Sequence, residues 1–302
     1  MKQKILKVFL VVLLIKPIGN INAQEKIRLT GKYLGENPPQ ETPQIFARGV
    51  VSTNNYVEFS CVFSPDGTEF YFTRRGGELT NNTIMYMKQS GGTWSLPKKA
   101  DFNSSQSTKY PVIFPDGRKI MFICGGMPGE EYNMVWVSDK SGDKRSNPVL
   151  LDSPINNKLA SYISIAKDSS LYFASRIGDN DIGIVKSRFL NGKYQIALPL
   201  APSINTPYIE SHPFVSPDES FIIYDSNRPG GYGDFDLYIS YKKKDGSWTE
   251  GANLGGLINT KGWDSCPWVT HDGKYFFFSS NGDIYWVDAK ILEKYKPGNL
   301  NY

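Results

Sequence analysis

The chain has 302 residues, of which 40% are hydrophobic, 14% aromatic and 21% charged, and its formal net charge is +4. This composition excludes an intrinsically disordered chain, because aromatic residues are too frequent and charged residues too few. Without residues 1–23, which carry four lysines and no acid, the formal charge falls to zero, so the basic balance does not indicate nucleic-acid binding.

Residues 1–23 have the pattern of a secretory signal peptide. Lysines come first, an apolar run extends from Ile5 to Ile15, and small polar residues lead to Ala23. This order of charge, apolar run and small-residue exit is typical of segments that are removed after export. We therefore expect cleavage near Ala23, a periplasmic or secreted protein, and an N-terminal extension over residues 24–42.

The rest of the chain predicts neither a membrane span nor a disulfide framework. No later stretch approaches the roughly 18 apolar residues that a membrane helix needs. Cys61, Cys124 and Cys266 are an odd number in a chain long enough to form a core without disulfides. We expect three buried free thiols; the alternative is a Cys61–Cys266 bridge, which requires Cα atoms within about 7 Å of each other.

Five copies of one phrase organise residues 43–288. Each copy has a turn related to Ser-Pro-Asp-Gly, followed by aromatic and aliphatic residues, as in Phe63-Ser-Pro-Asp-Gly67 before Phe70-Tyr-Phe72. A fixed period of this length indicates one structural unit per repeat. The turn aspartates, separated by 50, 52, 50 and 54 residues, are Asp66, Asp116, Asp168, Asp218 and Asp272.

Each repeat predicts four strands. Pro-Asp-Gly favours a tight turn, since Pro fixes φ, Asp bonds nearby backbone and Gly accepts positive φ. Runs of β-branched and aromatic residues lie on both sides of this turn, and a third run follows, for example Asp236-Leu-Tyr-Ile-Ser240. A glycine turn then leads to a fourth strand. A connector that contains Asn joins it to the next repeat, as in Ile204-Asn-Thr206.

The two ends of the repeat region complete one unit. The fifth repeat stops after its third strand, where Asp288 is expected to cap a short helix from Ala289 to about Tyr295, within a tail over residues 289–302. Its missing fourth strand matches Pro43-Gln-Ile-Phe46. We therefore predict an all-β fold, a single monomeric five-bladed β-propeller of four-stranded antiparallel blades, closed by the N-terminal strand that completes the last blade.

The phrase Ser-Pro-Asp-Gly, followed by aromatic residues and then by Asp-aliphatic-Tyr, resembles the Trp-Asp-repeat-like unit of TolB-type periplasmic β-propellers. The resemblance covers nearly all of residues 43–288. It is clearest at Ser226-Asn-Arg-Pro-Gly-Gly-Tyr-Gly233, which is similar to envelope proteins of Bacteroidetes-type bacteria. The third repeat departs from it, with Lys167-Asp-Ser169 in place of Pro-Asp-Gly. The resemblance implies an envelope propeller, a scaffold that serves binding, assembly or catalysis.

Motifs of catalysis or metal binding do not stand out. The sequence contains no Gly-x-Ser-x-Gly, no His-Glu-x-x-His, no phosphate-binding glycine loop and no Cys-x-x-Cys. The two histidines, His212 and His271, stand at different places in their repeats, and the paired aspartates fall where the repeat itself requires Asp. We expect no cofactor and no metal.

Candidate functional residues are the positions where the repeats differ in polar character near one mouth of the central channel. Eight residues before the turn aspartates, three repeats carry acids, namely Glu58, Glu210 and Asp264. Six residues before them stand Ser60, Tyr110, Tyr162, His212 and Cys266. At the end of the second strand, or beside it, stand Arg75, Arg176, Asn227 and Arg228.

These residues support two functions and one structural interpretation. Carboxylates from adjacent blades, together with His212, can serve as the acid and base of a glycoside hydrolase or polysaccharide lyase. The arginines, Asn227 and the tyrosines can instead hold a ligand by hydrogen bonds and stacking. In the structural interpretation, the carboxylates bond backbone amides of the neighbouring blade or pair with the arginines. The primary hypothesis is a binding or scaffold module for an envelope protein or an oligosaccharide, without nucleic acid as a partner.

Overall fold

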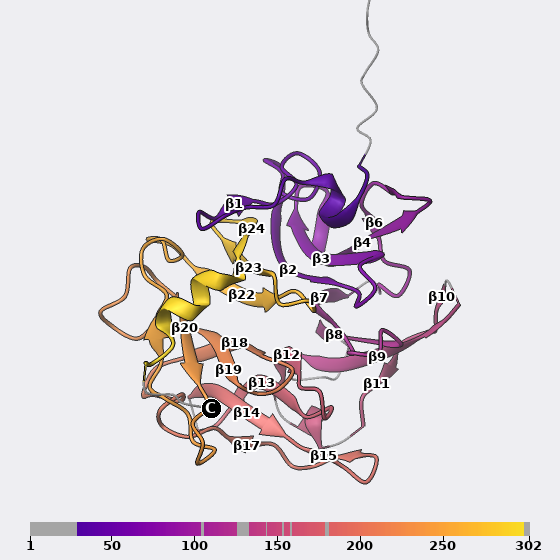
Figure 1. Cartoon of the computed structure of the whole chain (residues 1–302). Coiled ribbons are helices and arrows are strands. Elements are labelled where there is room, and N and C mark those ends of the chain that lie inside the picture. Colours follow the sequence, from indigo (N-terminus) through magenta and orange to yellow (C-terminus); the bar gives the residue numbers. More distant parts are fainter. Residues whose placement is uncertain are drawn as a thin grey trace, which may run out of the picture.

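The computed structural model describes residues 29–298 except 104–105, 126–132, 143, 153, 158 and 179–180. Five small antiparallel sheets lie around a central axis, as the blades of a propeller (Figure 1). The predicted signal peptide and its cleavage site lie outside the described residues. In the part of the chain that is described, no helix is long and apolar enough to cross a membrane.

Each blade has four antiparallel strands in chain order from the axis outward. The innermost strands are β2 (Val57–Phe63), β7 (Ser107–Ile113), β12 (Ser161–Ile165), β18 (Glu210–Val215) and β22 (Asp264–Val269). The second strands are β3 (Glu69–Gly76), β8 (Lys119–Gly125), β13 (Leu171–Arg176), β19 (Phe221–Ser226) and β23 (Tyr275–Ser280). The third strands are β4 (Leu79–Ser90), β9 (Met134–Ser141), β14 (Ile182–Ser187), β20 (Asp236–Tyr241) and β24 (Asp283–Asp288).

The outermost strands are short, which limits the exposed edges of the ring. They are β6 (Lys98–Lys99), β11 (Val149–Leu150), β17 (Leu198–Pro199), β21 (Ala252–Asn253) and β1 (Gln44–Ile45). Small hairpin strands extend three blades, namely β5 (Thr93–Trp94), β10 (Lys144–Arg145), β15 (Phe189–Leu190) and β16 (Lys193–Tyr194). Three short 3-10 segments complete the described elements, namely η1 (Lys32–Gly35), η2 (Ile155–Asn157) and η3 (Ala289–Tyr295).

The ring closes as predicted. Strand β1 pairs antiparallel with β24, with Gln44 opposite Trp286 and Ile45 opposite Tyr285, and Figure 1 shows the two side by side. Each innermost strand contacts the innermost strand of both neighbouring blades, including β2 with β22. After β24, the Asp288 side chain accepts a hydrogen bond from the Lys290 amide and begins η3. The predicted terminal helix is therefore present, in 3-10 form.

The turn between the first and second strands has the same chemistry in all five blades. The aspartate accepts a hydrogen bond from the amide two residues later, for example Thr68 N to Asp66 Oδ1 at 3.0 Å. The residue directly after the aspartate has positive φ in every blade. It is glycine in three blades, and Ser169 and Glu219 take its place in the other two. The third repeat therefore makes the same turn despite its altered sequence.

Connector residues hold the third strand of the blade that precedes them. The Asn205 amide both accepts from Ile184 N at 2.7 Å and donates to Ile184 O at 2.9 Å. The same paired contact recurs at Asn103, Asn156 and Asn259. In the fifth blade Ser52 takes this role toward Ile284. These contacts explain why the connector phrase recurs in the sequence.

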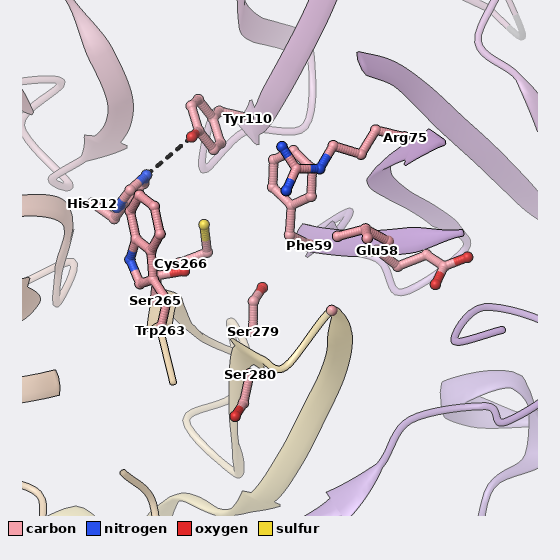
Figure 2. A pocket seen from close by; sticks show the side chains of 12 residues that line it. Glu58, Phe59, Arg75, Tyr110, His212, Trp263, Ser265, Cys266, Ser279 and Ser280 are labelled. Atoms are coloured by element: carbon pink, nitrogen blue, oxygen red, sulfur yellow. Dashed lines mark hydrogen bonds between the residues drawn. The ribbon is translucent and has the colours of Figure 1, made fainter. Parts of the chain in front are cut away.

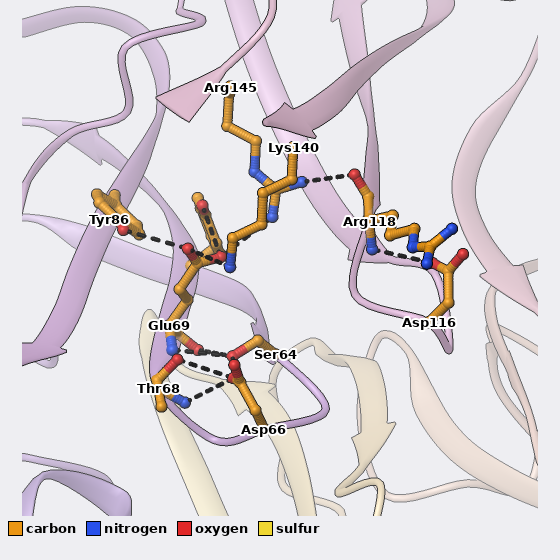
Figure 3. Close-up of polar contacts among 10 residues, drawn as sticks. Ser64, Asp66, Thr68, Glu69, Tyr86, Asp116, Arg118, Lys140 and Arg145 are labelled. Carbon is orange, nitrogen blue, oxygen red and sulfur yellow. Dashed lines mark hydrogen bonds and ion pairs between the residues drawn. The ribbon is translucent and has the colours of Figure 1, made fainter. Parts of the chain in front are cut away.

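Aromatic and aliphatic side chains of the strands form the core between the blades, and charged seams supplement it. Figure 3 shows the seam between the first two blades, where Glu69 is almost fully buried. Its carboxylate pairs with Lys140 at 2.8 Å and Arg145 at 3.1 Å, both from the second blade. The three cysteines are buried and free, as predicted, so the alternative Cys61–Cys266 bridge is wrong.

Candidate functional site

A bulge in every innermost strand builds the middle of the channel. The residue six positions before each turn aspartate has a φ between 45° and 59°, and the pairing with the second strand shifts register there. Residues other than glycine rarely adopt this conformation, and such residues often occur at functional sites. These five residues, which we call the bulge residues, are Ser60, Tyr110, Tyr162, His212 and Cys266.

Three of the bulge residues fill the channel. The rings of Tyr110, Tyr162 and His212 lie 5.2–5.3 Å from one another, mostly edge to face. The Tyr162 hydroxyl donates to the carbonyl of Pro267 at 2.7 Å, which fixes this ring against the fifth blade. The channel is therefore blocked in its middle and has two separate ends. We call them the connector end, where the innermost strands begin, and the turn end, where the Pro-Asp-Gly turns lie.

A polar pocket of about 170 Å³ occupies the connector end between the first and fifth blades. Phe59 and Arg75 line it from the first blade, and Ser265, Cys266 and Ser279 from the fifth. Tyr110 and His212 also line it, and the half-exposed Trp263 stands at its side (Figure 2). The pocket thus combines aromatic faces, hydroxyl groups and a guanidinium, which are groups that bind polar organic ligands.

The three predicted carboxylates are fully buried and hold the connectors. Glu58 accepts from Thr53 N at 3.2 Å and Thr53 Oγ1 at 2.9 Å. Glu210 makes the same two contacts with Thr206, and Asp264 makes them with Thr260. Each acid therefore bonds the backbone of the segment that leads into its own strand.

Arginines neutralise two of these acids. Arg74 lies 2.9 Å from Glu58, and Arg228 lies 3.2 Å from Glu210. Burial raises the pKa of Glu58, although its contacts with Thr53 and Arg74 oppose the shift. Burial also raises the pKa of Asp264 against the hydrogen bonds of Ser280 and Thr260. Glu58 borders the polar pocket, but its carboxylate points away from the pocket in Figure 2.

His212 is the centre of a hydrogen-bonded chain across the channel. Its Nδ1 lies 2.9 Å from Oδ1 of the fully buried Asp225, and its Nε2 lies 3.0 Å from the Tyr110 hydroxyl (Figure 2). Trp263 Nε1 and Ser211 Oγ also donate to the Asp225 carboxylate. Burial raises the pKa of Tyr110 well above its usual range. A carboxylate that orients imidazole is an arrangement able to hold or move a proton.

The structure gathers only part of the predicted set at one place. Glu58, Arg75, Tyr110, His212 and Cys266 line the polar pocket. The other predicted residues do not line it, namely Ser60, Glu210, Asp264, Tyr162, Arg176, Asn227 and Arg228.

Like Glu210 and Asp264, Arg228 and Asn227 make contacts that hold the fold. Arg228 packs over the Tyr238 ring at 4.4 Å and pairs with Glu210. Asn227 Oδ1 accepts from Ile209 N at 2.9 Å. Tyr162 instead lines the hollow on the far side of the filled channel, and Arg176 ends β13 with its side chain exposed.

Sequence reasoning missed Asp225 and Trp263. Asp225 lies seven residues after its turn aspartate, where two other blades have Thr73 and Ser279. These two hydroxyls accept hydrogen bonds from the amides of Tyr110 and Ser60 in the next blade, at 3.1 Å each. An acid within the apolar run Phe221-Ile-Ile-Tyr224 was the available signal, because an acid inside a strand core requires a buried partner.

The turn end of the channel has a second, apolar hollow of about 60 Å³. Aliphatic, aromatic and proline side chains line most of it, among them Pro111, Val112, Ile163, Phe214, Pro217 and Trp268. Among the described residues, neither end contains a group of three or more His, Cys, Asp or Glu that could hold a metal ion.

These features define the class of the protein, a closed five-bladed β-propeller with a blocked channel and a polar pocket at the connector end. No protein-family model matches the sequence, and no match is found among curated proteins. Solved structures similar to this chain are found, but their sequence identity to it is below 20%, so the similarity concerns the fold alone.

One similar solved structure is the endo-arabinase from Bacteroides thetaiotaomicron, with a TM-score of 0.52 and 14% identity over 83% of this chain and 96% of that chain. TolB proteins are also among the similar structures, as the repeat phrase predicts. The putative TolB from Agrobacterium tumefaciens has a TM-score of 0.49 and 17% identity over 75% of this chain and 71% of its own. TolB from Acinetobacter baumannii has a TM-score of 0.48 and 18% identity over 78% of this chain and 55% of its own.

Proposed function

We propose that the protein is an exported binding module whose ligand occupies the polar pocket at the connector end of the channel. The observation that carries this proposal is the division of roles among the polar residues. The three acids are withdrawn into structural contacts with the connectors, whereas Arg75, Trp263 and the pocket serines face the hollow. A concave site with aromatic walls and few polar groups is suited to a small polar ligand.

The pocket favours an oligosaccharide over an envelope protein. At about 170 Å³ it is large enough for roughly one sugar unit, and the Trp263 ring beside it offers an apolar face. Ser265 and Ser279 supply hydroxyls for hydrogen bonds with a sugar. A protein partner would bury a much wider area, typically about 800 Å² on each side. Export by the predicted signal peptide would place this site in the periplasm or outside the cell.

A second candidate function is a glycan-active hydrolase or lyase, and the Asp225–His212–Tyr110 chain favours it. The imidazole borders the pocket, and Asp225 fixes its orientation at 2.9 Å. The predicted acids Glu58, Glu210 and Asp264 do not supply the acid–base pair that such an enzyme needs, since each is bonded to its connector. A hydrolase or lyase would therefore have to use His212 and Tyr110.

Thermal unfolding of residues 24–302 against a panel of oligosaccharides and envelope fragments tests the proposal. A ligand at 100 times its Kd adds about 2.7 kcal/mol to the stability. This corresponds to a rise of several degrees in Tm for a domain of this size. We expect a glycan to raise the Tm, and Trp263→Ala to reduce this rise. The proposed site would be contradicted if only an envelope protein raised the Tm, or if the rise with a glycan were unchanged in Trp263→Ala.

Product analysis with the same glycan separates the two candidates. A binding module leaves the glycan intact after long incubation. Turnover that disappears in His212→Gln, with glycan binding retained, would instead establish the enzyme.

A further inference from the structure

Among the described residues, positive charge predominates around the polar pocket. Of those that line it, Glu58 is the only acid, and its carboxylate is held by Thr53 and Arg74 and turned away. The nearby Asp225 is fully buried and bonded by His212, Ser211 and Trp263. Neither acid therefore offers negative charge to the open part of the pocket.

Arg75 faces this pocket without an acidic partner among the described residues. Its side chain is exposed, and its guanidinium lies 6.0 Å from the centre of the Phe59 ring and points into the pocket in Figure 2. The neighbouring Arg74 is the residue that pairs with Glu58. Two consecutive arginines thus have different roles, one in the fold and one at the pocket.

Lys109 adds a second cation at the same end of the channel. It stands on β7 at the position equivalent to Phe59 and Ser265, both of which line the pocket. Its ammonium lies 5.1 Å from the centre of the Tyr110 ring, and within the described part of the chain it has no acidic partner. Burial lowers the pKa of Lys109, and the charge of Arg75 adds to this effect. Two cations that repel each other are stabilised when an anion binds between them.

We infer that the ligand of the polar pocket is an acidic sugar whose carboxylate binds Arg75, with the positive charge of Lys109 nearby. The inference rests on the proposed function and names its ligand class. The planar guanidinium matches a carboxylate in bidentate geometry. The sugar ring then lies against Trp263, with its hydroxyls toward Ser265 and Ser279.

Within the described chain, no helix begins at the pocket, so the helix N-terminus that commonly binds phosphate is missing there. This favours a carboxylate over a phosphate as the anion.

Calorimetric titration with digalacturonate and with its neutral counterpart galactobiose tests this inference. We expect the acidic disaccharide to bind at least tenfold more tightly at low salt, and this preference to shrink as NaCl is raised. Arg75→Gln should remove most of the preference, and Lys109→Gln should reduce it about threefold. Lys193→Gln changes the charge equally on the outer hairpin of the third blade and should leave both affinities unchanged.

The outcomes distinguish the inference from the function on which it rests. Equal binding of the two disaccharides, or a preference that survives Arg75→Gln, would overturn the acidic ligand but keep a sugar site. Inorganic phosphate binding as tightly as digalacturonate would show an anion site without sugar specificity, which also overturns the inference. Absence of binding by digalacturonate, galactobiose and the wider glycan panel would overturn both. Unchanged Tm values of the variants would show that the losses are local.

Discussion

The two ends of the channel differ in chemistry although the same five strands form both. At the connector end the strands present hydroxyls, Arg75 and Trp263 around an open pocket. At the turn end they present Val112, Ile163 and Phe214 around a smaller apolar hollow. Because the repeat fixes the backbone of both ends, the difference comes from side chains alone. The propeller thus supplies positions, and the side chains at these positions set the chemistry of each end.

Carboxyl groups at the two ends also shift in opposite directions. At the connector end burial dominates, and the pKa values of Glu58 and Asp264 are raised. At the turn end burial also acts to raise the pKa of Asp66, but hydrogen bonds from Ser64 and Thr68 outweigh it and lower the pKa. At Asp66 the hydrogen bonds therefore favour the charged carboxylate, whereas at Glu58 and Asp264 the polar contacts do not outweigh burial. Four substitutions test this difference between the two ends.

The largest effect on stability is expected in the filled middle of the channel, which separates the two ends. Tyr162→Ala removes a buried ring of the filled channel and leaves the Pro267 carbonyl without its 2.7 Å donor. We expect a loss of about 3–5 kcal/mol in the free energy of unfolding, measured in urea. Tyr208→Ala, at an exposed tyrosine, should cost less than about 0.5 kcal/mol. Equal losses in the two variants would contradict a packed barrier between the two ends.

Glu210→Gln tests whether a connector acid serves the fold. The change weakens contacts with Thr206, Ser226 and Arg228, so we expect a loss of about 1–3 kcal/mol in stability. Glu78→Gln, at an exposed acid, is the matched control. A variant with unchanged Tm but abolished glycan turnover would instead assign Glu210 to catalysis.

Glu219 tests the charged carboxylates of the turn end by their pH dependence. Burial raises its pKa, but hydrogen bonds from Lys186, Lys242 and Tyr172 outweigh this and lower it to about 2. Its stabilisation is therefore complete above its usual pKa of 4.5 and is lost as the pH falls from there toward 2. We expect Glu219→Gln to cost about 1–3 kcal/mol at pH 7 and to flatten the acid limb of the stability curve. An acid limb as steep as in the unsubstituted protein would refute this role.

The smallest expected effect concerns ligand affinity. Trp263→Ala removes the aromatic face beside the polar pocket, and we expect about a tenfold weaker glycan affinity, or about 1.4 kcal/mol. His271→Ala alters an exposed side chain at the turn end and should leave the affinity unchanged. Titration calorimetry of both variants measures the difference. The reverse pattern would move the ligand to the turn end.

Much of the fold could be predicted from the sequence because its determinants are local and repeated. Asp66 and its four equivalents indicate the turns, and connector residues such as Asn205 indicate the joins between blades. Ring closure was predictable from Pro43-Gln-Ile-Phe46. This N-terminal strand belongs to no repeat of its own, and the fifth repeat lacks its fourth strand.

The site was only partly predictable. Repeat alignment located Arg75, Tyr110 and His212, because equivalent positions in a propeller lie at equal height along the channel. It could not show that His212 and Tyr110 meet across the channel, since they are 102 residues apart and belong to non-adjacent blades. Nor could it show which way Glu58 points, because a side-chain direction depends on the partner that the fold supplies.

The most direct test of the account is a crystal structure of the protein with digalacturonate. We expect the sugar at the connector end between the first and fifth blades, with its carboxylate against Arg75 and its ring beside Trp263. A sugar seated in the apolar hollow near Trp268, or along the outer strands, would contradict the assignment of ligand binding to the connector end.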